Sequence, residues 1–521
     1  MKIHLNINHK DVHFAGLVLC VLGLLFSKPI LSSAEIIIAI NWLTWGNLRN
    51  KFCDFLKNKA AIVCSTVYLI HLVGLLYTKD WQFASNDLRI KLPILFFPVF
   101  LSTSPALSKK EFNTLLYFFI SSVFVSSLVS LYIYLGFSKK LIVDFRQISV
   151  FISHIIFSLL VCLTIFILLW LIFNECKNNI ILKMLFAGLI IWFIVFIFIL
   201  QSFTGIVILI VMSFVMLFYE LIKMKSYKLK IGILMSVITL LISIIWLIHT
   251  QYKEIYKVNK IDLTKLESRT KEGNYYNNDT ISKETENGNL IWIYVCDKEM
   301  REEWNKRSLL NYDGKDLKNQ VLKLTIIRYL TSKGLKKDGE GIKKLKNEEI
   351  QYIEKGIANI KYSRKFSFTN RLSQIIWEFK QSNARNYKSV YSVAQRIEFW
   401  KTGMMIIKDN YLIGVGTGDL KIAFDEQYKK ENSSLDESHR LRAHNQFITI
   451  FIAFGIIGLA IFLICIFYPA TKLKMWNNYF YVIFFIIFFL SLINEDTLET
   501  QAGATFFAFF NSLFLFRKKN D

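Results

Sequence analysis

The feature that most constrains this chain is a series of long apolar blocks. Blocks of about 20 residues with almost no charge recur through residues 14–249 and again through residues 444–516, and helices of that length cross about 30 Å of hydrocarbon. Within a bilayer, only helices and closed barrels satisfy all backbone hydrogen bonds. The blocks exclude a soluble enzyme, a fibrous protein and a disordered chain. The sequence therefore predicts an all-α polytopic membrane protein.

Composition and charge agree with this prediction. The 521 residues are 53% hydrophobic and 20% charged, whereas soluble domains have about 25% charged residues. A formal net charge of +23 would suggest nucleic acid as the partner of a soluble protein. Here the Lys and Arg residues lie in loops between apolar blocks and in one long polar segment. Membrane topology and attraction to anionic membrane lipids explain that distribution, so we expect no nucleic-acid partner.

The apolar blocks predict about twelve spans in two membrane domains. Residues 1–249 form an N-terminal membrane domain of about nine spans, and residues 444–521 form a C-terminal membrane domain of about three. Residues 250–443 separate them and are too long for a simple connection, so they are expected to form a mainly helical loop domain. The expected spans are 14–27, 31–46, 60–77, 90–106, 114–137, 148–173, 182–200, 204–221, 231–249, 444–468, 478–494 and 502–516.

The short loops indicate the orientation. Lys and Arg gather in the 47–59 and 222–230 loops, after the tenth span and after the last, and such loops are typical of the cytoplasmic side. Both termini are then cytoplasmic and the loop domain is extracytoplasmic. Lys139, Lys140 and Arg146 depart from the rule because they fall on the outer side. Either a span is miscounted or these cations bind an anionic ligand there.

Metal and redox motifs are missing from the sequence. The seven cysteines show no zinc or redox spacing, and there is no His-Glu-x-x-His motif and no Asp-x-Asp pair. We therefore expect no metal and no cofactor. His71 and His154 lie inside spans, where ionisable residues are functional candidates by default, but hydrogen bonding between helices would explain them equally well.

Four short motifs between Ser392 and Leu463 are the most informative part of the sequence. They read SVAQRIEFW (392–400), LIGVGTGDL (412–420), RAHNQF (442–447) and FGIIGL (454–459). In this order, before a late span, they resemble the O-antigen ligase and polymerase family of bacterial envelopes. Glu495 and Glu499 before the last span, and Gly503 entering it, belong to the same resemblance. The polar insert, with residues 286–288 and 325–334, resembles that of family members from Bacteroidetes.

The residues around His444 support a site independently of the resemblance. His444 lies where the outer polar segment enters the tenth span, and Arg442 and Asn445 flank it. The N-terminus of a helix carries free N–H groups and a positive dipole end, so it favours an anion. A lone histidine at the interface is more often without a role. The neighbouring cation and the motif favour a functional histidine here.

A second group of candidates precedes this one in the chain. Residues 391–408 have the spacing of an amphipathic helix, which carries Arg396 and Trp400. Arg396 either reaches the surface of the membrane beside that helix or binds phosphate through its paired donors, and we favour the second role. Gly414 and Gly416 lie in a glycine-rich turn that brings backbone close to a ligand. The turn lacks the preceding strand of a nucleotide-binding loop.

The resemblance implies glycosyl transfer at the periplasmic face of the bacterial inner membrane. The donor would be a glycan on undecaprenyl pyrophosphate, and the acceptor a hydroxyl of the lipid A-core or a similar glycan. His444 is expected to act as the base and Arg396 to neutralise the pyrophosphate, without metal and with inversion. Substrate contacts are expected from Arg442, Asn445, Trp400, Gly414, Gly416, Lys91, Lys139 and Lys140.

One departure from the family pattern concerns the turn before the eighth span. The family usually has Ser-Arg-Thr-Gly there, and its Arg is thought to hold phosphate, whereas residues 202–205 read Ser-Phe-Thr-Gly with Phe203 in that place. Another cation would have to substitute, or donor binding differs. The candidates are Lys139, Lys140, Arg146, Arg89 and Lys91.

Three other functions stay open. A polysaccharide polymerase would use the same donor with a lipid-linked glycan as acceptor. A transporter of lipid-linked glycans would show charged residues deep in several spans or two-fold repeats. A receptor that binds its ligand through residues 250–443 would leave the motifs around His444 unexplained.

Overall fold

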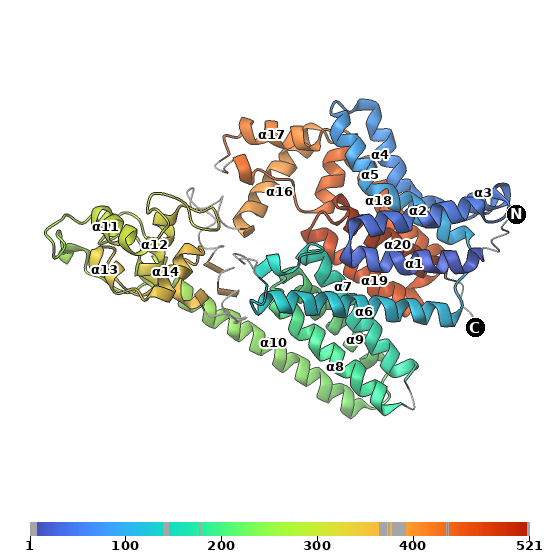
Figure 1. Ribbon diagram of the computed structural model, residues 1–521, viewed down its shortest axis with the longest axis horizontal. Helices are drawn as coiled ribbons and strands as arrows, with labels where there is room; N and C mark the ends of the chain where they lie inside the picture. Colours follow the sequence, from blue (N-terminus) through green and yellow to red (C-terminus); the bar gives the residue numbers. More distant parts are fainter. Residues whose placement is uncertain are drawn as a thin grey trace, which may run out of the picture. The chain divides into compact units, whose positions relative to one another are not determined.

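The structure is a computed structural model of the chain that describes residues 8–138, 145–176, 179–363, 372–373, 376–377, 392–433, 435 and 437–517. The described residues are mostly helical and divide into two compact units (Figure 1). The first unit comprises Met1–Lys140, Phe145–Tyr219 and Gln395–Asp521. The second comprises Leu141–Asp144 and Glu220–Ala394.

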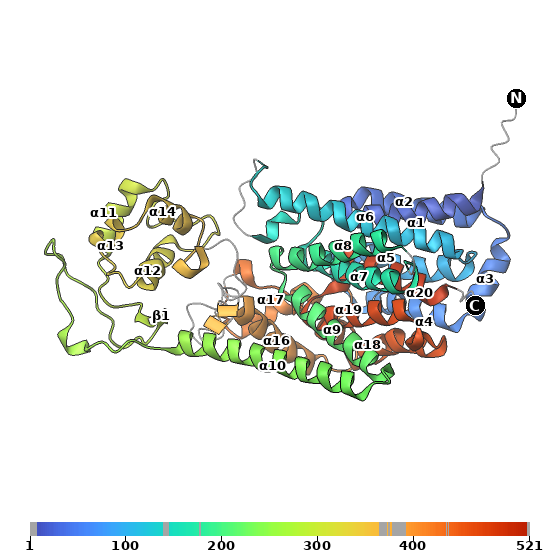
Figure 2. The same cartoon turned by 90° about the horizontal axis from the view of Figure 1, so that it is seen from below.

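The first unit is a bundle of long apolar helices with two shorter polar helices. Within it α5 packs against α4 and α20, and α18 packs against α4. On another side α1 packs against α2 and α6, and α7 packs against α8 and α19 (Figure 2). The helices are α1 (His9–Phe26), α2 (Lys28–Thr44), α3 (Leu48–Lys57), α4 (Lys59–Val73), α5 (Trp81–Thr103), α6 (Lys109–Tyr134), α7 (His154–Asn174), α8 (Ile180–Ile199), α9 (Phe203–Lys223), α16 (Ser392–Asp409), α17 (Leu420–Lys430), α18 (Gln446–Lys472), α19 (Tyr479–Asn494) and α20 (Gln501–Phe516).

Each of the twelve expected spans coincides with a helix in the structure. Among the described residues, eight helices are long and apolar enough to cross a membrane, and α19 and α20 are shorter apolar helices. The prediction of a helical membrane protein is confirmed. The count of twelve spans and the extracytoplasmic side of the loop domain stay predictions.

Aromatic contacts explain why the chain carries 46 phenylalanines. Helices α19 and α20 meet through stacked and edge-on rings, such as Phe488 on Phe507 with centroids 4.3 Å apart and Phe484 on Phe506 at 5.5 Å. Lipid tails are as apolar as these side chains, so helices in a bilayer associate through close packing and polar contacts. Preferred offset and edge-on ring geometries add to that packing.

The second unit combines one long helix with a small folded domain. Helix α10 (Tyr227–Tyr256) is apolar and has no buried residue among those described. The domain contains α11 (Asp297–Arg307), α12 (Leu322–Ser332), α13 (Gly339–Lys343), α14 (Asn347–Glu354) and the antiparallel strands β1 (Thr285–Glu286) and β2 (Asn289–Leu290). Its core surrounds Trp304, whose indole N–H donates to the carbonyl of Leu310 over 2.8 Å.

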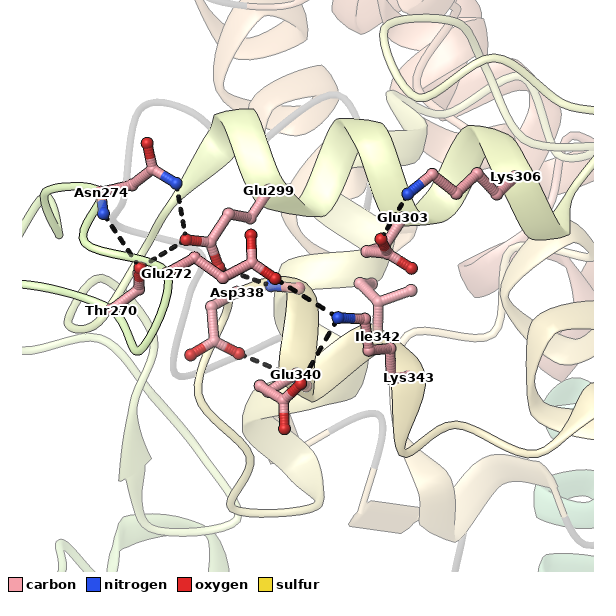
Figure 3. A network of polar contacts seen from close by, with 12 residues as sticks. Thr270, Glu272, Asn274, Glu299, Glu303, Lys306, Asp338, Glu340, Ile342 and Lys343 are labelled. Carbon is pink, nitrogen blue, oxygen red and sulfur yellow. Dashed lines mark hydrogen bonds and ion pairs between the residues drawn. The ribbon is translucent and has the colours of Figure 1, made fainter.

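Polar contacts fix the loops that surround this core. Figure 3 shows the buried carboxylate of Glu299, which accepts from the hydroxyl of Thr270, the amide of Asn274 at 2.9 Å and the backbone N–H of Gly339 at 3.2 Å. These donors satisfy the charge that burial would otherwise destabilise. Burial alone would raise the pKa of Glu299, but the hydrogen bonds outweigh it and lower that pKa.

Residues 250–443 are divided between the two units. The segment up to Ala394 belongs to the second unit, whereas α16 from Gln395 onward, α17 and the turn before α18 belong to the first. The motif-bearing part of the loop is therefore packed with the membrane helices. The domain boundaries expected from the sequence stay a prediction.

Lys337 gives the second unit a pH-dependent stability. Its side chain is buried, and the ammonium donates to the carbonyl of Leu290 over 3.3 Å. Burial lowers the pKa of Lys337 from 10.5 to about 8. Between these values the unfolded chain binds more protons than the folded one, so the contribution of Lys337 to stability rises with pH from about 8 to about 10.5.

We predict that Lys337→Met stabilises the protein at neutral pH, by up to about 3 kcal/mol, because it removes a buried ammonium. It should also abolish the rise in stability above about pH 8. Thermal unfolding of the full chain in detergent, at neutral and alkaline pH, measures both effects. Lys336→Met, at a more exposed neighbour, is the matched control and should preserve the pH dependence. An unchanged pH profile in Lys337→Met would contradict the assignment.

Candidate functional site

Glu495 joins the two residues that were expected to carry the chemistry. It lies in the turn between α19 and α20, and its carboxylate is 2.8 Å from Nη2 of Arg396 on α16. The other carboxylate oxygen is 3.4 Å from Nδ1 of His444, which immediately precedes the cap of α18. The side chains of Arg396 and His444 are 28% and 34% exposed, so both reach solvent or a ligand.

The start of α18 is held against the same turn. Asn445 caps the helix by accepting from the backbone N–H groups of Phe447 and Ile448, and its own amide donates to the carbonyl of Ile493. His444 adopts a left-handed backbone conformation with φ +47°, which is uncommon for a residue other than glycine. Its backbone N–H donates to Asp496 over 3.2 Å. The cap and this hydrogen bond fix the backbone from which the imidazole projects.

Glu499 is the buried counterpart of Glu495. Its two oxygens lie 2.9 Å from Lys91, 2.9 Å from Arg442 and 3.1 Å from the amide of Gln446. Burial would raise the pKa of Glu499, but Lys91 and Arg442 outweigh it and hold that pKa well below its usual range. Glu499 is therefore ionised and ties α5, α18 and the α19–α20 turn together.

Lys91 connects the ion pairs of Glu499 to further charged residues inside the bundle, and together they form a buried ionic network. Lys91 is 1% exposed and pairs with Asp87, one turn earlier on α5, as well as with Glu499. Nε2 of His71 on α4 lies 3.9 Å from Asp87, and its Nδ1 lies 2.8 Å from the carbonyl of Val67. The expected substrate contact from Lys91 stays a prediction, because this side chain reaches no surface in the structure.

The positive and negative charges of the candidate site nearly balance. Arg396, Arg442 and Lys91 supply three positive charges, and Asp87, Glu495, Asp496 and Glu499 supply at most four negative ones. Asp496 is buried and accepts from Thr449 over 2.7 Å. Burial raises the pKa of Asp496, against the opposing effect of Arg442. An arriving anion would have to displace a carboxylate from an arginine.

Helix α16 presents the middle of its predicted apolar stripe outward, whereas Ile407 of that stripe is buried. Ile397, Trp400 and Met404 are exposed, whereas Phe399 and Ile406 are buried against the bundle. Trp400 donates from its indole N–H to the carbonyl of Ala443 over 2.9 Å. The ring of Phe399 lies 5.8 Å from that of His444. The stripe therefore borders the candidate site, and Trp400 links α16 to the turn that carries His444.

The glycine-rich turn packs against other parts of the protein and does not form an open loop for a ligand. The backbone N–H groups of Val415 and Gly416 donate to carbonyls at a kink in α18, over 2.9 Å each. Gly414 has φ +72°, and a Cβ there would lie 2.4 Å from the backbone of Ala453. Contact of Gly414 or Gly416 with a substrate stays a prediction.

Phe203 opens α9 beside the candidate site. Its side chain is 48% exposed, and the next residue, Thr204, accepts from the amide of Asn494 over 2.6 Å. Arg89 is exposed on α5 and donates to Asn86. Lys139 and Lys140, two cations considered as substitutes for the missing arginine, lie outside the described residues, as does the side chain of Arg146.

Four carboxylates of the site were missed by the sequence reasoning or given no partner. Glu495 and Glu499 were noted in a turn without partners, and Asp87 and Asp496 were not considered. The spacing of Asp87 and Lys91, one helical turn apart, is a signal that would have found their ion pair. Among the described residues, no group of three or more His, Cys, Asp or Glu side chains is arranged to hold a metal ion. Metal independence stays a prediction.

Comparison with known families gives a match that covers part of the candidate site. Residues 357–463, about a fifth of the chain, match the O-antigen ligase family. They carry Arg396, Arg442 and His444, so the family resemblance indicated by the motifs is confirmed there. The match supports a glycosyltransferase-like membrane enzyme. No curated protein matches the chain.

We predict that Lys91→Met destabilises the protein by about 3–5 kcal/mol, because it leaves Asp87 and Glu499 buried without their shared cation. The double variant Lys91→Met/Asp87→Asn removes one charge of each sign and should recover most of the lost stability. Thermal unfolding of the purified full chain in detergent measures this difference.

The matched control for this measurement is Lys109→Met. Lys109 forms an exposed ion pair with Glu175 at 2.9 Å, and the change should cost at most about 1 kcal/mol. Equal destabilisation by the single and double variants would show that the charge balance at Lys91 is not what stabilises the network.

Proposed function

We propose that this protein is an O-antigen ligase-like glycosyltransferase of the bacterial inner membrane. It would transfer a glycan from undecaprenyl pyrophosphate to a hydroxyl of the lipid A-core, or of a similar acceptor, at the periplasmic face. The observation that carries the proposal is the shared contact of His444 and Arg396, two residues of the region that matches the family, with Glu495. That contact puts a base and a phosphate-binding group next to each other.

His444 supplies the base in this proposal. The acceptor oxygen attacks the anomeric carbon while its proton moves to Nε2 of His444. Glu495 lies at the opposite ring nitrogen, Nδ1, where a carboxylate holds the imidazole in position and stabilises the imidazolium that forms. No hydrogen bond joins Nε2 to a described residue. The electron pair of the broken bond leaves with the pyrophosphate, and a single displacement inverts the configuration.

Arg396 and Arg442 neutralise the leaving pyrophosphate. The two arginines differ in their partners, because Glu495 beside Arg396 is 14% exposed, whereas Glu499 beside Arg442 is 2% exposed. A pyrophosphate that takes the place of Glu495 on Arg396 would leave this carboxylate to His444 alone. Preorganised cations can stabilise a developing negative charge without a metal. Donor binding would thereby leave Glu495 available to stabilise the protonated imidazole of His444.

One observation favours a second candidate, a transporter of lipid-linked glycans. His71, Asp87 and Lys91 are buried ionisable residues on α4 and α5, and such residues within spans commonly mark proton or ion pathways. A transporter would use them and leave the contacts of His444 without a role.

Reconstitution with a defined lipid-linked donor and two competing acceptors tests the proposal. Transfer to lipid A-core acceptor supports a ligase, whereas a lengthened lipid-linked glycan identifies a polymerase. Movement of the donor across the bilayer without any transfer product identifies a transporter. Activity that is lost in EDTA and restored by magnesium or manganese would contradict the metal-free mechanism.

We predict different defects for the two central residues. His444→Ala should lower single-turnover transfer about 10²–10⁴-fold, the usual contribution of a general base, with little change in donor binding. Arg396→Ala should weaken donor binding and also slow transfer. Arg396→Lys should recover only part of both, because an ammonium lacks the paired donors of guanidinium.

Donor binding and single-turnover transfer of purified variants distinguish these defects. Arg440→Ala is the matched control, because Arg440 donates to the carbonyl of Leu435 outside the network and its loss should change neither quantity greatly. Near-normal transfer by His444→Ala would remove it as the base and direct attention to Glu398 or a carboxylate near Glu495.

A further inference from the structure

Helix α3 is built unlike its neighbours in the bundle. It spans Leu48–Lys57 and has no buried residue. Leu48, Phe52 and Leu56 are 44%, 58% and 53% exposed. Because these residues are four positions apart, they form a single apolar stripe along the helix. An exposed apolar stripe of this size on a helix with several charged residues favours an apolar partner.

Apart from Cys53 and the half-buried Phe55, the rest of the helix is polar and mainly basic. Arg49 and Lys57 are exposed on α3, and Lys59 follows at the start of α4, whereas Asp54 is the one acidic residue of the helix. An apolar stripe beside basic residues is the pattern of a helix that lies in the plane of a membrane surface. Basic residues at that depth are attracted to anionic lipid headgroups.

The connections of α3 keep it close to the ends of apolar helices. One residue, Asn58, separates α3 from α4, and residues 45–47 connect it to α2. Lys51 lies over the rings of Trp42 and Trp45, with its ammonium 4.9 and 5.9 Å from their centroids. Tryptophan is enriched at the boundary between hydrocarbon and headgroups. The two rings and the short connections place α3 at that boundary.

We propose that α3 docks on an anionic lipid surface. The stripe of Leu48, Phe52 and Leu56 enters the outer part of the acyl region, while Arg49, Lys57 and Lys59 contact lipid phosphates. A second copy of the chain is the less favourable occupant, because a symmetric contact would bring the same cations of both copies together.

Fluorescence quenching in nanodiscs tests the docking. The full chain carries a single fluorophore, either at Phe52→Cys or at Asn50→Cys, each in a Cys53→Ser background. The six other cysteines are buried, and Asn50 is an exposed residue on the other side of the helix. One protein per disc excludes contact with a second copy. Quenchers are a spin label attached to lipid and aqueous iodide.

The proposal expects lipid-attached label to quench the Phe52→Cys probe and iodide to quench the Asn50→Cys probe. Equal quenching of both probes by iodide would overturn it. Replacing Arg49, Lys57 and Lys59 by Gln should weaken docking in discs with anionic lipid, roughly fivefold for each cation. Docking that depends neither on these cations nor on anionic lipid would overturn the headgroup contact.

Native Cys53 gives a second measurement if a variant does not fold. Cys53 is exposed on α3 next to the stripe. Its reaction with an uncharged maleimide in discs should slow severalfold when anionic lipid replaces zwitterionic lipid. An unchanged rate would count against the proposal without any substitution in the helix.

Discussion

A carboxylate buried between apolar helices has to be neutralised, and much of this site depends on how Glu499 meets that requirement. Lys91 and Arg442 reach it from α5 and from the turn before α18, and Gln446 adds a neutral donor. Removing a single partner of such a group leaves an uncompensated charge, which is far more destabilising than loss of a surface ion pair. The network therefore fixes the positions of three segments that are distant in the sequence.

The same chemistry has a different consequence at Glu495, where burial is less complete. Glu495 pairs with Arg396 and lies near His444, and both of these side chains are partly exposed. Partly exposed ion pairs contribute less to stability than buried ones, so the proposed exchange of an anionic ligand with the carboxylate would cost less at Glu495 than at Glu499. The ion pairs around Glu499 are buried and fixed, whereas those around Glu495 are partly exposed. The proposed chemistry uses the ion pairs around Glu495.

Much of the fold was predictable because the length of an apolar segment is a property of the local sequence. Each expected span coincides with a helix, and the amphipathic helix that carries Arg396 is present as α16. The partners of the charged residues were not predictable, since ion pairs such as Lys91–Glu499 join residues from distant parts of the chain. The glycine-rich turn illustrates the same limit. Its spacing indicated a close backbone approach, but only the structure identified α18 as what it approaches.

The sequence by itself determined that this is a helical membrane protein, and its motifs indicated the family that residues 357–463 match. Tertiary structure decided which side of α16 faces outward, which cations are already paired, and that His444 and Arg396 share one carboxylate. The physical reason is that the spacing of apolar residues shows which face of a helix is shielded from water. It does not show whether lipid or protein covers that face. The availability of a charge depends on partners and burial that only the folded chain brings together.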